Sequence, residues 1–434
     1  MKKLFCRFAL ISSILISFAV TSFAQNEQLG TGSVYSFFGI GTLNDFKNPQ
    51  AAGMGLSGVA TLNVANASLA NPALWGYTFY TVGAGGVSIS NYETSVSGGQ
   101  NVNSNLNATH LQLVFPINRS KLGLSFSIAP ISETSYNFTQ TDNIFLLGDQ
   151  TALQADFEVE RSGSGGLNAM ELGVGYRINE ELAIGWAPSL IFGDIKRREA
   201  YGFTAGNNQL PSAIVNDESN VGFGNRFGLL YRKADIFKKD DHVIFGTEVT
   251  LATRLSSDLK RRTEVQRGVV TSTISRDADG VDTELPFRLT SGLTYSPSTI
   301  WTFGSEFLYE NWSNFESEFN RQSGGVTNDR IRLGIGAQVI PGGARGRRFF
   351  EILQYRAGFS YDTGYLRIQG QDIGGWSVHS GIGFPSKFSL STFDISAQYG
   401  VLGTKSAGLA QEKIFSLRLS FNLSELMFAK RRIQ

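Results

Sequence analysis

The sequence has 434 residues, a formal net charge of +1, 17% charged residues and one cysteine. The low charge content excludes a basic field for nucleic acid. Because the cysteine, Cys6, lies in an expected leader, disulfide and thiol chemistry are excluded from the mature chain. Beyond the leader no window holds about 18 uninterrupted apolar residues, which excludes helical membrane spans.

Residues 1–24 have the order of a secretory signal peptide. A basic start is followed by an apolar run from Phe8 to Val20, and a small-residue pattern ends at Ala24. We expect cleavage after Ala24. A secreted chain of this composition is either a large all-β protein or a transmembrane β-barrel.

The next segment, residues 25–76, contains the stretch "NPQAAGMGLSGVATLNVANASLANPALWG" from Asn48 to Gly76. It is rich in Gly, Ala and Asn and carries hardly a charge. The side chains of such a segment are too small to form a hydrophobic core by themselves, yet the segment is too apolar to be a solvated linker. Its packing surface must therefore come from another part of the chain.

Alternation with a period of two dominates residues 77–423. In one strand candidate Leu122, Leu124, Phe126 and Ile128 share a face opposite Gly and Ser. Elsewhere the face opposite the apolar residues carries charges: Glu171, Arg177, Arg226, Glu248, Glu306, Arg332, Arg356, Asp394 and Arg418. These charges would be costly in a dry sandwich core but are natural in a wet lumen. The pattern therefore predicts a barrel.

The connections between strand candidates alternate between short and long. Examples of the short class are "INRSK" and "INEE", whereas long connections are expected over 132–166, 196–220 and 256–282. Short periplasmic turns and long outer loops are typical of transmembrane barrels, so the sequence predicts an all-β, antiparallel barrel of about fourteen strands. An even count places both termini in the periplasm, with residues 424–434 as a basic tail.

Catalytic chemistry is not indicated. The three histidines, His110, His242 and His379, lack a recognisable nucleophile motif, and structural or lumen-lining roles are expected for them. No metal-ligand spacing is present. We therefore predict a protein that is not an enzyme and needs no cofactor or metal.

The segment "AAGMGLSGVATLNVANASLANPALWG" resembles the N-terminal segment of the FadL-like outer-membrane transporters of long-chain fatty acids and other hydrophobic compounds. That family has "AGMGGAGVA" and "NPA" elements at this place. The matching positions are Ala52, Gly53, Met54, Gly55, Gly58, Val59, Ala60, Asn71, Pro72 and Ala73. "YENWSNF", from Tyr309 to Phe315, is similar to an element on a late strand of the same family.

The resemblance implies that residues 25–76 form a hatch inside the barrel, with Gly53, Gly55, Asn71, Pro72 and Ala73 as hatch or gating residues. Gly and Ala allow close backbone packing, and Asn-Pro favours turning.

In the family, hydrophobic ligands leave sideways through a gap at a kinked strand. Pro130 lies in the third strand candidate and cannot donate to the ladder, so it is the candidate for that kink. Pro116 and Pro188 also lie near strand ends.

An apolar cluster follows the third strand: Ile144, Phe145, Leu146 and Leu147. It is either a capture site for hydrophobic ligands in an outer loop or part of a loop tucked into the barrel mouth.

The resulting hypothesis is a monomeric outer-membrane barrel for passive, hatch-gated uptake of small hydrophobic molecules. Its partners would be the hydrophobic ligand and outer-membrane lipid, with no nucleic acid. The alternative is an accessory barrel that transports nothing and docks other envelope proteins in a secretion or assembly complex.

Overall fold

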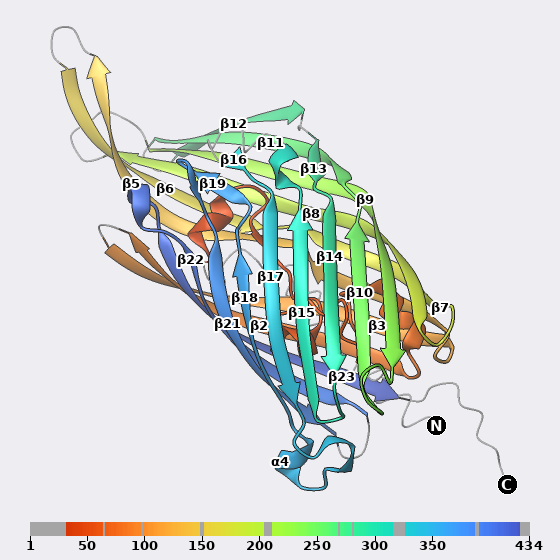
Figure 1. Ribbon diagram of the computed structural model, residues 1–434. Coiled ribbons are helices and arrows are strands. Elements are labelled where there is room, and N and C mark those ends of the chain that lie inside the picture. Colours follow the sequence, from red (N-terminus) through yellow and green to blue (C-terminus); the bar gives the residue numbers. More distant parts are fainter. Residues whose placement is uncertain are drawn as a thin grey trace, which may run out of the picture.

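The computed structural model describes residues 32–63, 66–96, 99–147, 152–203, 211–267, 270–279, 282–315, 326–386 and 390–425. Strands dominate, and they close into an antiparallel barrel of 14 strands, as predicted (Figure 1). In order around the barrel the strands are β2 (Thr81–Val96), β3 (Gly99–Asn118), β4 (Leu122–Pro130), β7 (Asn168–Arg177), β8 (Leu182–Phe203), β9 (Ser212–Ala234), β10 (His242–Thr250), β14 (Arg288–Ser296), β15 (Trp301–Glu310), β17 (Arg330–Val339), β18 (Gln354–Asp362), β21 (Gly375–Pro385), β22 (Thr392–Gly403) and β23 (Gln411–Glu425).

The first and last strands close the ring. β2 and β23 pair antiparallel from Thr81↔Glu425 to Ser95↔Gln411. Outward-facing apolar side chains are exposed, including Phe126, Leu172 and Ile335, which is the surface a bilayer covers. Within the described residues no helix is both long and apolar enough to cross a membrane.

Short turns join the strands at one end of the barrel, which we call the short-turn rim. The longest of them contains the helices η4 (Gly343–Arg345) and α4 (Phe349–Ile352), which lie at the lower end of the barrel in Figure 1. The opposite, long-loop end carries η3 (Trp312–Asn314), η5 (Ser406–Gly408) and a small sheet of β16 (Val326–Thr327), β19 (Leu366–Ile368) and β20 (Gln371–Asp372).

Three of the expected long loops are largely strands. β5 (Ser132–Leu147), β6 (Ala152–Gly165), β11 (Thr253–Arg267), β12 (Val270–Asp279) and β13 (Thr283–Leu285) join the upper halves of β8 and β9. The expectation of loops over 132–166, 196–220 and 256–282 was therefore wrong. The reason is that alternation continues beyond the barrel: in β11, Leu255 and Leu259 are buried between exposed Arg254, Asp258 and Lys260.

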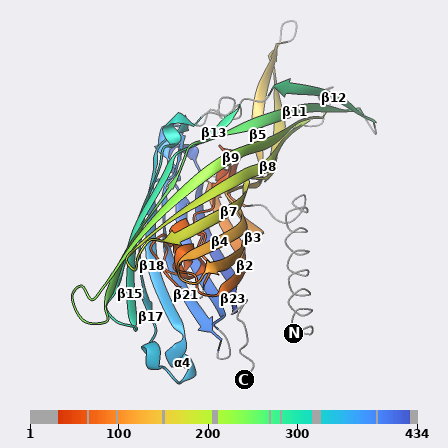
Figure 2. The ribbon, with the colours of Figure 1, turned by 90° about the vertical axis from the view of Figure 1, so that its right-hand side faces the viewer.

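The N-terminal segment contains η1 (Val34–Phe37), β1 (Thr42–Leu43), α2 (Pro49–Ala52) and η2 (Pro72–Tyr77). Figure 2 shows this red and orange segment enclosed by the barrel strands. η2 runs through Tyr77 and the first barrel strand begins at Thr81, slightly later than the boundary expected at residue 77.

Candidate functional site

Glycines line the inner wall where the N-terminal segment passes closest to it. A Cβ atom on Gly358 of β18 would lie 1.9 Å from the carbonyl oxygen of Met54, and one on Gly123 of β4 would lie 2.2 Å from that of Trp75. Real Cβ atoms do not approach other heavy atoms this closely. The wall glycines therefore form the groove that receives the segment.

Asn71 connects the segment to two barrel strands. Its buried side chain caps η2 by accepting a hydrogen bond from the Ala73 amide at 3.0 Å. The same side chain donates to the carbonyl oxygens of Val59 (3.0 Å), Leu229 on β9 (3.1 Å) and Thr247 on β10 (3.3 Å). One side chain thus fixes the end of the segment against the wall.

The other predicted hatch residues also meet the wall. Pro72 starts η2 with its ring at the first helical position. A Cβ atom on Gly53 would lie 3.1 Å from the Cα of Gly381, and Gly55 has a φ of +72° with no room for a side chain beside His379. The structure places all five predicted residues at the inner wall.

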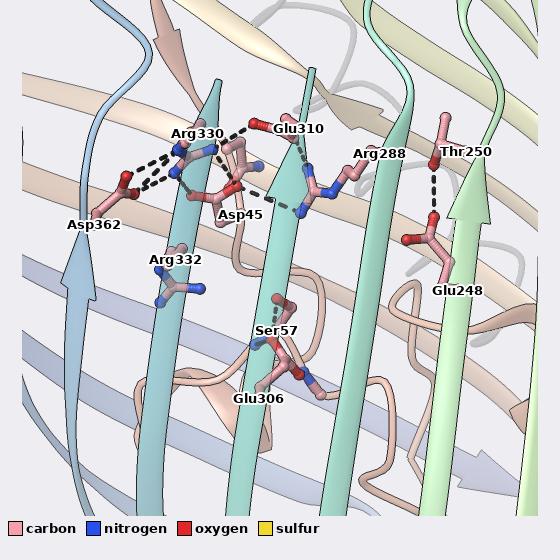
Figure 3. Close-up of polar contacts among 12 residues, drawn as sticks. Asp45, Ser57, Glu248, Thr250, Arg288, Glu306, Glu310, Arg330, Arg332 and Asp362 are labelled. Carbon is pink, nitrogen blue, oxygen red and sulfur yellow. Dashed lines mark hydrogen bonds and ion pairs between the residues drawn. The ribbon is translucent and has the colours of Figure 1, made fainter. Parts of the chain in front are cut away.

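Buried ion pairs connect Asp45 of the segment to the barrel (Figure 3). Arg330 donates to Asp45 and also to Glu310 at 2.9 Å and Asp362 at 3.0 Å, while Arg288 lies 3.4 Å from Asp45 and 3.2 Å from Glu310. Burial raises the pKa of Asp45, but the neighbouring arginine charges outweigh it and hold the pKa well below its ordinary value. Asp45 is therefore an ionised part of a network of buried ion pairs.

A second network lies on the other side of the segment. Arg226 of β9 pairs with Glu171 through two contacts of 2.7 Å and with Glu248 at 3.2 Å. Its guanidinium also donates to the carbonyl oxygen of Leu69 at 2.9 Å. The charges of this network are thus satisfied by each other and by the backbone of the segment.

Glu306 of β15 binds the segment through its backbone. Its carboxylate accepts the amides of Ser57 at 2.7 Å, Gly58 at 2.9 Å and Val59 at 3.2 Å, together with the Ser57 hydroxyl (Figure 3). Sequence reasoning identified Glu306 as lumen-facing but could not show that it holds the segment.

Arg332 and Arg418 differ from most of the inner-wall arginines. They lie over the Phe46 ring at 4.7 and 4.3 Å, and each donates to a neutral oxygen, of Gly55 and Gln398 respectively. Among the described residues neither forms an ion pair with a carboxylate. The paired wall arginines are Arg197, Arg226, Arg288, Arg330 and Arg356.

Both arginines border a cavity of about 230 Å³, which we call the upper cavity. Its walls are mostly apolar, with Tyr92, Tyr365 and Trp376 among them. Arg330, Asp45 and Asp362 also border this cavity, and they pair with one another. A mostly apolar cavity beside two further arginines that form no ion pair among the described residues suits a ligand with an apolar body and an anionic end.

A second cavity of about 110 Å³, the lower cavity, lies behind the third strand. Its lining includes Pro130, Ile131 and Trp312. Leu43, Asn44 and Phe46 line both cavities. The stretch 43–46, which includes Asp45, therefore forms a partition between them.

The barrel wall is split beside the lower cavity. The β3–β4 ladder ends at Leu111↔Ile128, and β4 itself ends at Pro130. The chain then continues as β5, which within the described residues pairs with β6 and the short β1 but not with β3. The predicted kink residue thus stands where the ladder stops.

Side chains and the N-terminal segment bridge this split. Glu133 of β5 accepts hydrogen bonds from Asn105 and Asn107 of β3. The Gly32 amide donates to the Ser135 carbonyl at 2.9 Å. Polar side-chain contacts therefore replace the ladder here.

The apolar cluster Ile144–Leu147 forms the end of β5, paired with residues 152–155 of β6, and not a loop. Its side chains lie outside the described residues. In the described part of the chain no group of three His, Cys, Asp or Glu side chains is placed to hold a metal ion.

A closed barrel of fourteen strands around an N-terminal segment defines the FadL-like fold, and solved structures share it. The CymD monoaromatic hydrocarbon channel is 14% identical, with a TM-score of 0.58 over 89% of this chain and 100% of that one. The P. putida toluene transporter TodX is 13% identical, with a TM-score of 0.57 over 88% and 99%. A Pseudomonas aeruginosa FadL homologue is 12% identical, with a TM-score of 0.57 over 88% and 98%.

The chain belongs to the BamG family, whose model matches residues 4–434. A comparison with curated protein sequences finds no match. The predicted FadL-like recognition is confirmed at the level of the fold.

Proposed function

We propose that this chain is a monomeric outer-membrane barrel for the passive passage of small hydrophobic molecules with an anionic end. The short-turn rim faces the periplasm, and the last strand, β23, ends at this rim at Glu425. Passage needs no cofactor, and the barrel performs no covalent chemistry.

The observation that carries this proposal is the split beside Pro130. Behind it lies the lower cavity, lined by Leu43, Ile191 and Leu285 among others. A mostly apolar space therefore reaches a stretch where, among the described residues, β3 and β5 form no ladder. A molecule in the lower cavity could move through this stretch into the bilayer without entering water. Two proteins with the same fold, a monoaromatic hydrocarbon channel and a toluene transporter, support the proposal that hydrophobic molecules take this path.

The hatch would gate the path at the partition. Residues 43–46 separate the two cavities, and Asp45 holds them against Arg330 and Arg288. An anionic ligand near Arg332 also lies near Arg330, since both arginines border the upper cavity. The ligand would compete with Asp45 for Arg330 and so weaken the ion pair that holds residues 43–46 in place. The partition could then move.

Closing the split should stop passage. The variant Asn105→Cys/Glu133→Cys, joined by a short bifunctional thiol reagent, is expected to lose about nine-tenths of the flux of a labelled fatty acid into proteoliposomes. The expected mature chain has no other cysteine. A matched control, Ser95→Cys/Gln100→Cys, joins two strands that are already paired and should leave flux unchanged. Full flux through the tethered variant would refute lateral exit.

The upper cavity should select for an anionic end. In the variant Arg332→Gln/Arg418→Gln, affinity for a long-chain carboxylate is expected to fall about 10- to 100-fold, because two charge-assisted contacts are lost. Affinity for the matching alcohol should change little. Calorimetry with both ligands measures this, and an equal loss for both would argue against an anion site.

One observation favours the accessory-barrel reading as a second candidate. β5, β6, β8, β9, β11 and β12 pair in that order and extend from the long-loop end (Figure 2). Among the described residues β12 pairs only with β11, which leaves an edge that a partner chain can extend. Cross-linking mass spectrometry on intact membranes would test this: a partner joined to residues 270–279 in cells would support it.

A further inference from the structure

The short-turn rim presents aromatic side chains to water on one arc. Phe237 is 75% exposed in the β9–β10 turn, and Phe350 is 71% exposed in the β17–β18 turn. Exposed basic residues stand beside them: Lys238, Lys239, Arg345, Arg347 and Arg348. We call these side chains, together with Ile300 and Trp301, the basic rim.

The β9–β10 turn is rigidly built. The Asp241 carboxylate accepts the amides of Ile236 at 2.7 Å, Phe237 at 3.1 Å and Lys238 at 3.2 Å. The Phe237 ring meets Tyr295 edge-on at 5.7 Å. Phe237 is therefore held outward by the fold.

The β17–β18 turn is built in a similar way. The Glu351 carboxylate accepts the amides of Arg347 and Arg348 at 3.1 Å, and the Glu351 carbonyl accepts the Gly342 amide at 2.8 Å. Phe349 and Phe350 pack edge to face at 5.4 Å and project from this frame. The exposed aromatic pair is therefore a formed feature of the rim.

The two turns belong to one surface. Only the β14–β15 turn stands between them, and the Ile340 amide donates to the Ile300 carbonyl at 2.9 Å. Beside it, Trp301 stacks on Phe303 on the outer, lipid-facing wall. The β7–β8 turn of the same rim carries Glu180 and Glu181 instead.

We propose that the basic rim binds the head groups of anionic phospholipids in the leaflet next to it. Aromatic rings with an apolar body are stabilised at the head-group level of a bilayer. Basic residues at the same level attract anionic lipids. Because the basic rim is continuous with the lipid-facing wall at Trp301, the lipid leaflet is the partner that can reach both kinds of side chain at once.

The experiment uses the full chain in nanodiscs of phosphatidylcholine and phosphatidylglycerol, with retained lipid counted by native mass spectrometry. The wild type should enrich phosphatidylglycerol at least about fivefold. The variant Lys238→Gln/Lys239→Gln/Arg345→Gln/Arg347→Gln should enrich it less than about twofold. Arg348 is kept because it lies 3.8 Å from Glu351.

A control removes two exposed basic residues of the long-loop end that form no ion pair within the described residues, Lys260 and Lys405, and should behave as the wild type. A spin label at Phe350→Cys should report a head-group environment that deepens with phosphatidylglycerol content. No enrichment in the wild type, equal loss in the control, or a label that stays in water would each overturn the proposal. The last result would fit a surface that docks a soluble protein instead.

Discussion

Asp45→Ala is expected to open the partition between the two cavities. The substitution removes the carboxylate that Arg330 and Arg288 hold, while Arg330 keeps Glu310 and Asp362. Breaking a buried ion pair costs about 3 to 5 kcal/mol because it leaves a buried charge unpaired. Since Arg330 keeps two carboxylate partners, we expect a cost of about 3 kcal/mol. We expect fatty acid flux into proteoliposomes to rise about tenfold or more, since about 3 kcal/mol corresponds to more than two decades in population.

The control for this experiment is Asp258→Ala, which removes an exposed carboxylate of β11 far from the partition. It should leave flux and thermal stability unchanged. Unaltered flux through Asp45→Ala in a folded barrel would mean that the ion pairs do not hold the gate.

Gly358→Val is expected to unseat the hatch. Its Cβ would lie 1.9 Å from the Met54 carbonyl oxygen and 2.9 Å from the Ile335 carbonyl oxygen, and neither backbone atom can rotate away. Overpacking a tight contact costs about 1 to 3 kcal/mol, and a clash with backbone costs more. We expect protease to cut within residues 48–60 of the variant while the barrel keeps its heat-modifiable migration on gels.

Gly202→Val is the matched control. This glycine also lies in a long strand, β8, but a Cβ there would meet only the Glu158 carbonyl oxygen, at 4.0 Å. It should be as resistant to protease as the wild type. Equal resistance in Gly358→Val would show that the segment does not depend on the glycine groove.

The barrel itself was predictable because its signals are local. The alternation of apolar and small residues from Leu122 to Ile128 indicates that the two faces of one strand lie in two different environments. The order of short and long connections reports the two ends of the barrel. Neither signal requires knowledge of which distant residues meet.

The role of the lumen charges was predicted only in part. Glu171, Arg226 and Glu306 do face inward, but they are buried against the N-terminal segment and do not line open water. The expected wet lumen is therefore replaced by paired charges around a packed segment. Burial of this kind depends on the N-terminal segment, which supplies backbone donors and acceptors that no strand pattern reveals.

The partners across the lumen could not be predicted at all. Asp45 and Arg330 are 285 residues apart, and their meeting depends on the register of many strands together with the path of the segment. The stretch from Asn48 onward stands out by its lack of charge, whereas Asp45, just before it, forms the ion pairs with the wall. The extension of β8, β9 and β11 was also missed, since polar alternating strands beyond a membrane resemble loops.

The measurement that tests the proposed path most directly is photolabelling with a long-chain fatty acid that carries a diazirine near its methyl end. The protein is labelled in native membranes, and the labelled peptides are mapped by mass spectrometry with and without excess unlabelled ligand. The proposed path predicts competed labels within 41–46, at the partition, and within 127–131, at the split. Labels confined to the outward faces of β14, β15 and β17, unaffected by competition, would contradict passage through this barrel.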